Sequence, residues 1–221
     1  MFLKAYKRAL AVLVKKPVLL WGLSLMAQLL LWIAGIITLP IVALTLVATY
    51  LIQAGLTTLY LDGLQGKAVN SDQLFAAFNK NGFRIAGGFA WRDLWLVIWG
   101  LIPLAGPVLA IIKSYEYRFV PYILMTKPEV SATAALRLSK EMTKGKKTQM
   151  FLADLLVYVA YGVVNAVLAL FAAIPFVGIL FGIIMFAFNV VFFALQGIFT
   201  GLYSASFYLP EEENKAEDTA A

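Results

Sequence analysis

The sequence has no cysteine and no histidine among its 221 residues, and only 14% of its residues are charged. The lack of cysteine excludes disulfide bonds and thiolate chemistry. The lack of histidine excludes the commonest general base, proton shuttle and metal ligand. Apolar residues are abundant instead and make up 62% of the chain. Since soluble domains are about half apolar and a quarter charged, this composition indicates an integral membrane protein.

Long apolar runs give the next level of organisation. About 20 apolar residues in a helix cross roughly 30 Å of hydrocarbon. Six runs of about this length lie at residues 18–39, 41–61, 85–104, 107–124, 150–173 and 178–207. Basic residues precede the first run, as in a secretory signal. That run is longer than the apolar part of a signal peptide and lacks a small-x-small cleavage pattern, so we expect a retained membrane helix.

The distribution of charge predicts how these runs are oriented. Short uncharged turns at residues 38–40, 102–107 and 174–178 join the runs in pairs. The segments between pairs are basic: the first 17 residues carry five Lys/Arg and no acid, and residues 127–149 carry six Lys/Arg. Lys and Arg are retained on the cytoplasmic side. The sequence therefore predicts six membrane-crossing helices arranged as three hairpins, with both termini cytoplasmic, in a multi-pass protein of the cell membrane.

Each hairpin follows a basic segment with helical apolar spacing, which is typical of an amphipathic helix lying in the membrane interface. Two of these segments begin with capping residues, Asn70 or Ser71 in one and Ser131 in the other. The chain thus resembles three copies of one unit, at residues 2–61, 71–126 and 131–209. We expect an all-α polytopic membrane bundle over residues 1–209, with interfacial helices. Residues 210–221 are too polar to pack, and predict a disordered acidic cytoplasmic tail.

One part of the chain resembles a known family. Residues 110–155 contain "IIKSYEY", "PYIL" and "ALRLSKEMTKGKK". In these motifs, and in the apolar pattern around them, the chain resembles an uncharacterised bacterial integral-membrane family, domain-of-unknown-function nine-seventy-five. The resemblance implies a polytopic bacterial membrane protein. It implies no activity and no functional residues.

Charged residues inside apolar runs are the candidate binding site. There are six of them: Arg92, Asp93, Lys113, Glu116, Arg118 and Asp154. Charges within membrane segments are expensive, so they compensate one another or line a wet cavity. Three interpretations stay open: a cavity that binds a polar or zwitterionic molecule, a set of buried ion pairs that fix helix register, or charges that reach the interface by snorkelling because residues 107–124 do not span fully.

The spacing of these charges predicts their partners. Lys113 and Glu116 are three residues apart, so they can pair on one helix face. Arg118 points away from Glu116, and at a helix rise of about 1.5 Å per residue Asp93 or Asp154 reaches a similar depth. We therefore expect Arg118 to pair with Asp93 or Asp154.

Two further patterns have structural or functional interpretations. Tryptophan recurs every fourth residue at Trp91, Trp95 and Trp99. We interpret this as a lipid-facing or packing stripe rather than a cation-binding site. Small residues recur in the last run at Gly197, Gly201 and Ala205, a pattern that favours close helix approach and a homo-oligomer.

No enzyme motif, phosphate loop, metal-ligand cluster or nucleophile signature is present in the sequence. We therefore predict a non-enzyme without cofactor or metal that binds or transports a lipid or small amphiphile. The alternative is an accessory or scaffold protein whose basic cytoplasmic face recruits a partner or anionic lipid. The net charge of +6 lies beside apolar runs, so we expect membrane lipids rather than nucleic acid as its counterpart.

Overall fold

The computed structural model describes residues 7–8, 11–12, 17–38, 42–79 and 81–209. Every regular element in this part of the chain is helical, which confirms the all-α prediction. The elements are α2 (Pro17–Thr38), α3 (Val42–Leu64), η1 (Ser71–Phe75), α4 (Ala76–Asn79), α5 (Gly82–Gly100), α6 (Gly106–Glu116), α7 (Val120–Thr126), α8 (Ala132–Met142), α9 (Lys147–Ala172) and α10 (Gly178–Tyr208). The predicted first surface helix, the turn at 38–40 and the tail at 210–221 lie wholly or largely outside the described residues.

Three of the described helices are long and apolar enough to cross a membrane: α3, α9 and α10. An apolar run at Trp21–Ile36 in α2 is slightly shorter. α10 has 31 residues and therefore measures about 46 Å at 1.5 Å per residue, well beyond the hydrocarbon thickness. These elements thus have the length and apolar composition that the sequence predicted for membrane-spanning helices.

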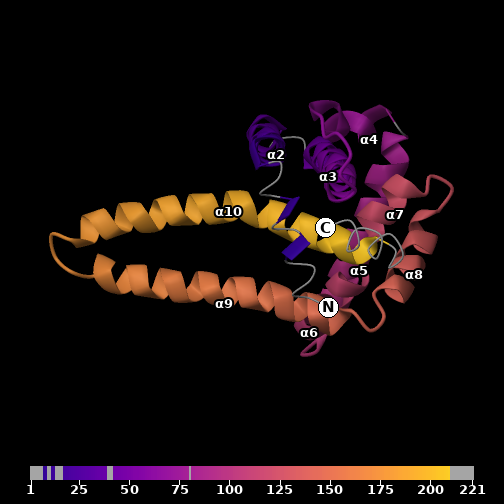
Figure 1. Cartoon of the computed structure of the whole chain (residues 1–221). Helices are drawn as coiled ribbons and strands as arrows, with labels where there is room; N and C mark the ends of the chain where they lie inside the picture. The colour runs from indigo at the N-terminus through magenta and orange to yellow at the C-terminus, as the bar shows by residue number, and fades with distance from the viewer. Residues whose placement is uncertain (1–6, 9–10, 13–16, 39–41, 80, 210–221) are drawn as a thin grey trace.

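The helices pack at one end and separate at the other. α9 and α10 run side by side away from the body of the molecule, whereas α2 and α3 are viewed nearly end-on (Figure 1). Burial follows this shape: in α3 the buried residues run from Tyr50 to Leu64, and in α10 from Ile198 onward. We call this packed region the base. Because hairpin one crosses hairpin three steeply, a bundle of six parallel spans is not confirmed.

The predicted fourth span, residues 107–124, is not one helix. α6 ends at Glu116, and α7 begins at Val120 after a short link, residues 117–119. Proline in a helix interior lacks a hydrogen-bond donor and clashes with the carbonyl four residues earlier, which for Pro121 is that of Tyr117. Pro121 instead occupies the first turn of α7, where proline is tolerated. α6 alone measures about 16 Å, so it is too short to span.

The turns of the second and third hairpins have the same backbone structure. In the second, Gly106 donates to the carbonyl of Ile102 at 2.7 Å, and Leu104 has φ +64°. In the third, Gly178 donates to the carbonyl of Ile174 at 2.7 Å, and Phe176 has φ +67°. The shared pattern is Ile-Pro-x-x-Gly. These similar turns favour the predicted repeat, which otherwise stays a prediction.

The surface helices pack only part of their apolar residues against protein, since Phe75 and Phe78 are exposed. Ser131 caps α8, as predicted, by accepting from the amide of Ala134. Ala135 and Leu136 of α8 are buried against neighbouring helices, and the position of α8 in the membrane interface stays a prediction. In the other segment, Leu74 of η1 packs on α3 so closely that a Cβ at Gly55 would lie 2.1 Å from the Leu74 carbonyl oxygen.

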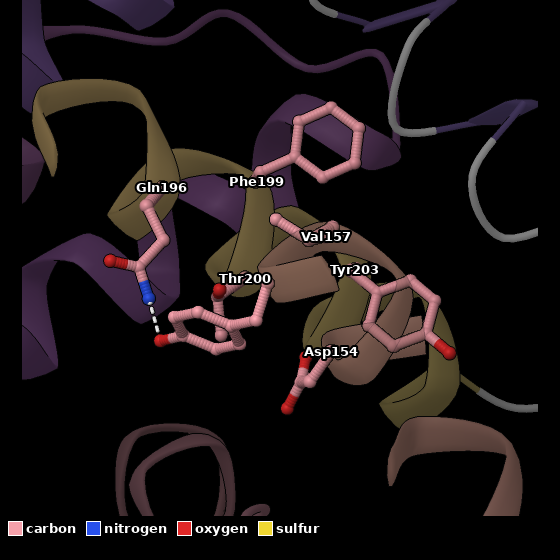
Figure 2. Close-up of a pocket in the computed structure, with 7 residues that line it drawn as sticks. Asp154, Val157, Gln196, Phe199, Thr200 and Tyr203 are labelled. Atoms are coloured by element: carbon pink, nitrogen blue, oxygen red, sulfur yellow. Dashed lines mark hydrogen bonds between the residues drawn. The ribbon is translucent and has the colours of Figure 1, made fainter. Parts of the chain in front are cut away.

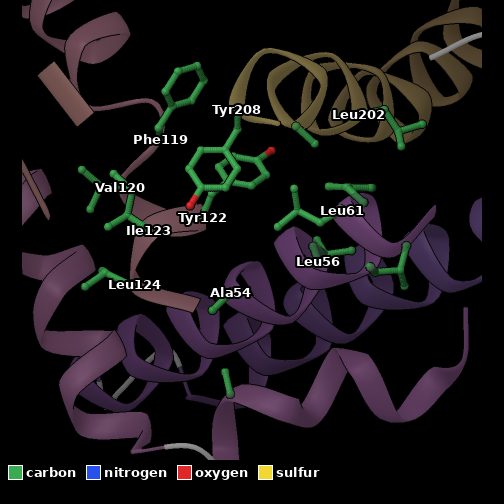
Figure 3. Close-up of a cluster of buried hydrophobic side chains, with 14 of the residues drawn as sticks. Ala54, Leu56, Leu61, Phe119, Val120, Tyr122, Ile123, Leu124, Leu202 and Tyr208 are labelled. Carbon is green, nitrogen blue, oxygen red and sulfur yellow. The ribbon is translucent and has the colours of Figure 1, made fainter. Parts of the chain in front are cut away.

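The hydrophobic core lies in the base, where α3, α7 and α10 meet. Phe119 and Ile123 are completely buried there, and the rings of Tyr122 and Tyr208 stack with centroids 5.3 Å apart (Figure 3). Leu202 of α10 and Leu56 of α3 close the same cluster. The base is thus a densely packed core. α7, which follows the break, is part of it.

Candidate functional site

Arg118 lies in the link between α6 and α7, at the centre of the base. Its guanidinium donates to both carboxylate oxygens of Asp154 on α9, at 2.6 and 3.2 Å, and its Nε donates to Ser204 Oγ on α10 at 2.7 Å. Tyr115 donates to the same carboxylate at 3.0 Å. Of the two partners predicted for Arg118, the structure therefore selects Asp154. The pair ties the broken helix to both helices of the third hairpin.

Glu116 forms a second group of charges at the last residue of α6. It is 5% exposed and accepts from Lys113 and from Lys147, each at 2.7 Å. The predicted pair between Lys113 and Glu116 is confirmed, and Lys147, the first residue of α9, joins it. The Lys113 ammonium also lies 4.7 Å above the Trp99 ring. This group joins α5, α6 and α9.

The break between α6 and α7 leaves backbone groups without helical partners, and α8 supplies them. Ser139 Oγ donates to the Glu116 carbonyl at 2.7 Å and accepts from the Phe119 amide at 3.1 Å. Thr143 Oγ1 approaches the same carbonyl at 3.5 Å. Both side chains are completely buried. Buried backbone groups must be paired. The side chains of α8 therefore stabilise the break between α6 and α7.

Arg92 and Asp93 lie apart from these two groups. They pair with each other at 2.7 Å, and Tyr50 of α3 donates to Asp93 at 2.8 Å. Within the described chain neither residue forms an ion pair with the other four predicted site residues. The six predicted charges are thus separated into three paired groups rather than gathered in one cluster.

A groove of about 460 Å³ opens beside Arg118. Helices α2, α3, α5 and α10 form its walls together with the link and the start of α7. Its polar lining residues are Gln28, Gln53, Thr57, Tyr60, Arg118, Tyr122, Gln196, Thr200 and Ser204. Leu56, Phe89, Pro121 and Phe193 provide apolar wall. This is the size and mixed lining of a small-molecule site.

Two amides in the groove are unused. Within the described residues, the side chains of Gln28 and Gln53 form no hydrogen bond. Both lie about halfway along apolar helices and are half-buried, so their amides can reach a molecule that enters the groove. A search of the sequence for charge alone misses them, although glutamine within a long apolar run is itself a signal.

A much smaller pocket of about 20 Å³ lies against the same stretch of α10. Asp154, Thr200 and Tyr203 line it, and the Gln196 amide is hydrogen-bonded to the Tyr158 hydroxyl (Figure 2). Gln196 and Thr200 also line the groove, so the two spaces share a wall. The small pocket has room for about one water molecule.

The two stripes noted in the sequence pack within the chain. The rings of Trp91 and Trp95 meet edge to face at 6.0 Å. A Cβ at Gly201 would lie 2.0 Å from the Tyr60 ring, and one at Gly197 would lie 2.9 Å from Gln28 Nε2. Gly197 and Gly201 therefore face α2 and α3, and Ala205 is completely buried. A homo-oligomer, which stays a prediction, would need another surface.

A polar contact inside the third hairpin was not predicted from the sequence. Asn189 of α10 donates to Asn165 Oδ1 of α9 at 2.9 Å and accepts from the Tyr161 hydroxyl. The Tyr161 ring stacks on Phe192 with centroids 4.0 Å apart. We call Tyr161, Asn165 and Asn189 the asparagine contact. It joins the two long helices outside the base.

Comparison with known proteins adds no relative: no family model, no curated protein and no solved structure matches this chain. The resemblance to the bacterial membrane family therefore stays a prediction that rests on the motifs in residues 110–155. In the described residues no group of three or more His, Cys, Asp or Glu side chains could hold a metal ion.

Proposed function

We propose that this chain is a multi-pass protein of the cell membrane that binds a lipid or small amphiphile in the groove beside Arg118. The observation that carries the proposal is the pair of unused amides, Gln28 and Gln53, in a groove between apolar hairpins. An amphiphile satisfies both kinds of wall, because its head group pairs with the amides and its chain contacts Phe193 and Leu56. Its transport across the membrane is a further step of the same proposal.

The orientation proposed for this site has both termini in the cytoplasm. Each hairpin leaves and returns to the base, so this holds whether or not every tip reaches the far side. The basic segments then lie on the cytoplasmic side. A cysteine placed at Phe176, in the turn of the third hairpin, is expected to react with impermeant thiol reagents from outside. A cysteine at Ala105 shows whether the tip of the second hairpin, which returns through the short α6, also reaches that side. A cysteine at Gly66 is the control, and its labelling from outside would reverse the orientation.

The experiment for the binding function is mass spectrometry of the molecules retained through gentle purification. We expect the wild-type chain to retain an amphiphile that a variant carrying both Gln28→Leu and Gln53→Leu loses. The control is Gln65→Leu, which changes an amide at the end of α3, outside the groove. Equal retention by all three proteins, or no retained amphiphile, would reject the groove as a binding site.

The basic face supports a second candidate function. Arg137, Lys140 and Lys144 are exposed on α8 and its following turn, whereas the buried side of α8 is covered by protein. This face is therefore presented outward, where each charge near an anionic membrane contributes about 1 kcal/mol. Recruitment of anionic lipid or an acidic partner predicts higher thermal stability in anionic than in neutral lipid, with the difference reduced by salt. Equal melting temperatures in anionic and neutral lipid would contradict this second candidate function.

A further inference from the structure

We propose that the groove selects an amphiphile with an uncharged head group rich in hydroxyl or carbonyl groups, such as a diacylglycerol or glycosyl diacylglycerol, over an anionic phospholipid. This inference rests on the proposed binding function and adds the chemical class of the ligand. Three observations carry it: the charge of the groove, the hydrogen-bonding groups on its walls, and its size.

The charge of the groove is balanced before any ligand enters. Among the described residues that line it, Arg118 is the one ionised side chain. Its guanidinium already holds both carboxylate oxygens of Asp154, and the pair is mostly buried. An anionic head group would have to share the guanidinium with Asp154, which leaves one net negative charge in an apolar surrounding. That charge is costly to desolvate. An uncharged head group avoids this cost.

The free hydrogen-bonding groups also fit an uncharged ligand. The amides of Gln28 and Gln53 each offer two N–H donors and one carbonyl acceptor. Arg118 uses three of its five N–H groups in the bonds to Asp154 and Ser204, which leaves two donors. Hydroxyl groups both donate and accept, so they pair with both ends of an amide. An ionised phosphodiester itself only accepts, so a phosphate placed between the amides would leave the glutamine carbonyl oxygens unpaired. In phosphatidylglycerol the two hydroxyls that can donate lie beyond this charged group, whereas in an uncharged glycolipid they follow the glycerol directly.

The size of the groove limits what enters it. A volume of about 460 Å³ accommodates a glycerol or sugar head group with the first part of its chains, but not two complete acyl chains. On the α10 wall, the Gln28 amide and the Tyr60 ring pack against Gly197 and Gly201, so these two side chains lie close to the helix backbone. The remaining length of the acyl chains would extend along the apolar, exposed part of α10 that precedes Phe193 in the sequence, residues 179–193. The groove therefore selects a lipid by its head group rather than by its acyl chains.

The test is a competition between lipids that share the same acyl chains. The purified chain receives equal amounts of diacylglycerol, monoglucosyl diacylglycerol and phosphatidylglycerol, and the bound lipids are counted by native mass spectrometry. Phosphatidylglycerol also binds the basic face, so the groove is measured as the difference between wild type and the Gln28→Leu/Gln53→Leu variant. We expect this difference to consist of an uncharged lipid, at least about fivefold over phosphatidylglycerol, which corresponds to about 1 kcal/mol.

The outcomes separate the two proposals. If the difference is mainly phosphatidylglycerol, or shows no preference, the groove binds lipid but the inferred head group is wrong. If wild type and variant bind the same lipids in the same amounts, the proposed function itself fails. Gly197→Ala provides a second variant, since its added methyl displaces the Gln28 amide without removing it. It is expected to lower the preference for uncharged lipid, whereas Gln65→Leu is expected to keep it.

Discussion

The second and third hairpins begin from the same turn and end as different structures. Both turns have the pattern Ile-Pro-x-x-Gly and the same hydrogen bonds. After the second turn, the returning helix α6 stops after 11 residues, and Arg118 follows in the link. After the third turn, α10 continues for 31 residues without a break. Similar turns therefore do not determine the path of the chain beyond them.

The difference between the returning helices has a cause within the second hairpin. The backbone groups that it leaves unpaired are paired by a residue from another helix. Pro121 prevents a continuous helix through the link, whereas α10 contains no proline. Ser139 of α8 then pairs with the backbone groups that the break exposes. The break places Arg118 where it reaches Asp154 and the groove at once. We infer that the second hairpin brings Arg118 to the groove, that the third hairpin holds it there, and that the first hairpin supplies the free amides of Gln28 and Gln53.

The largest expected effect is the loss of the ion pair that joins these hairpins. Arg118→Leu leaves the half-buried Asp154 without an ion-pair partner and with the Tyr115 hydroxyl as its remaining donor. This is expected to lower the free energy of unfolding by about 3 kcal/mol, the lower end of the range for a broken buried ion pair. Asp154→Leu is expected to have a similar effect, because it leaves the positive charge of Arg118 without its partner. Equilibrium unfolding in detergent micelles measures both, and the double variant is expected to recover most of the loss.

Asp93 provides the control for this pair. Adding Asp93→Leu to Arg118→Leu is expected to recover nothing, because Asp93 is held by Arg92 and Tyr50. Recovery with Asp93→Leu, or no loss in Arg118→Leu alone, would contradict the pairing described for the base.

The equivalent turns are expected to respond equally to the same substitution. A Cβ at Gly106 would lie 2.2 Å from the Gly100 carbonyl oxygen, and one at Gly178 would lie 2.2 Å from that of Ala172. Since backbone must shift in both cases, Gly106→Ala and Gly178→Ala are each expected to lose about 1–3 kcal/mol of unfolding free energy. Thermal unfolding in micelles measures this.

Two helical glycines serve as matched controls for the turns. A Cβ at Gly87 in α5 or Gly182 in α10 would meet no atom within 4 Å. Gly87→Ala and Gly182→Ala are therefore expected to leave stability unchanged or slightly raised. A loss in only one of the two turn variants would show that the turns are not equivalent in energy.

The smallest expected effect concerns the asparagine contact, which only the third hairpin has. Asn189→Leu removes its bonds to Asn165 and Tyr161 but adds an apolar side chain in an apolar stretch of α10. Hydrogen bonds between membrane helices contribute about 0.6 kcal/mol on average and up to about 1.7 kcal/mol. We expect a loss in this range by unfolding in micelles. A loss as large as that of Arg118→Leu would mean that the third hairpin is held by its own contact rather than by the base.

Much of the secondary structure was predictable from the sequence, because apolar length and turn residues act locally. The predicted runs 18–39, 150–173 and 178–207 correspond to α2, α9 and α10 within a few residues. Pro121 marks the break in the run 107–124, but the apolar length of that run alone does not show it.

The site was predictable only in its charged residues. The sequence indicated Lys113 with Glu116 and gave Asp154 as one of two partners for Arg118. The groove was not predictable, because Gln28, Gln53 and Ser204 come from three helices whose meeting depends on the steep crossing in the base. Whether uncharged polar residues in apolar runs form a site depends on how the helices that carry them cross.

In-cell photocrosslinking compares the groove with the third hairpin most directly. A photoreactive residue in place of Gln53 lies in the groove, and one in place of Phe186 lies on an exposed part of α10. Lipids captured at Phe186 are expected to reflect the composition of the whole membrane. Capture at Gln53 is expected to be enriched in one uncharged amphiphile. The same lipid composition at both positions, or no lipid captured at Gln53, would contradict binding in the groove.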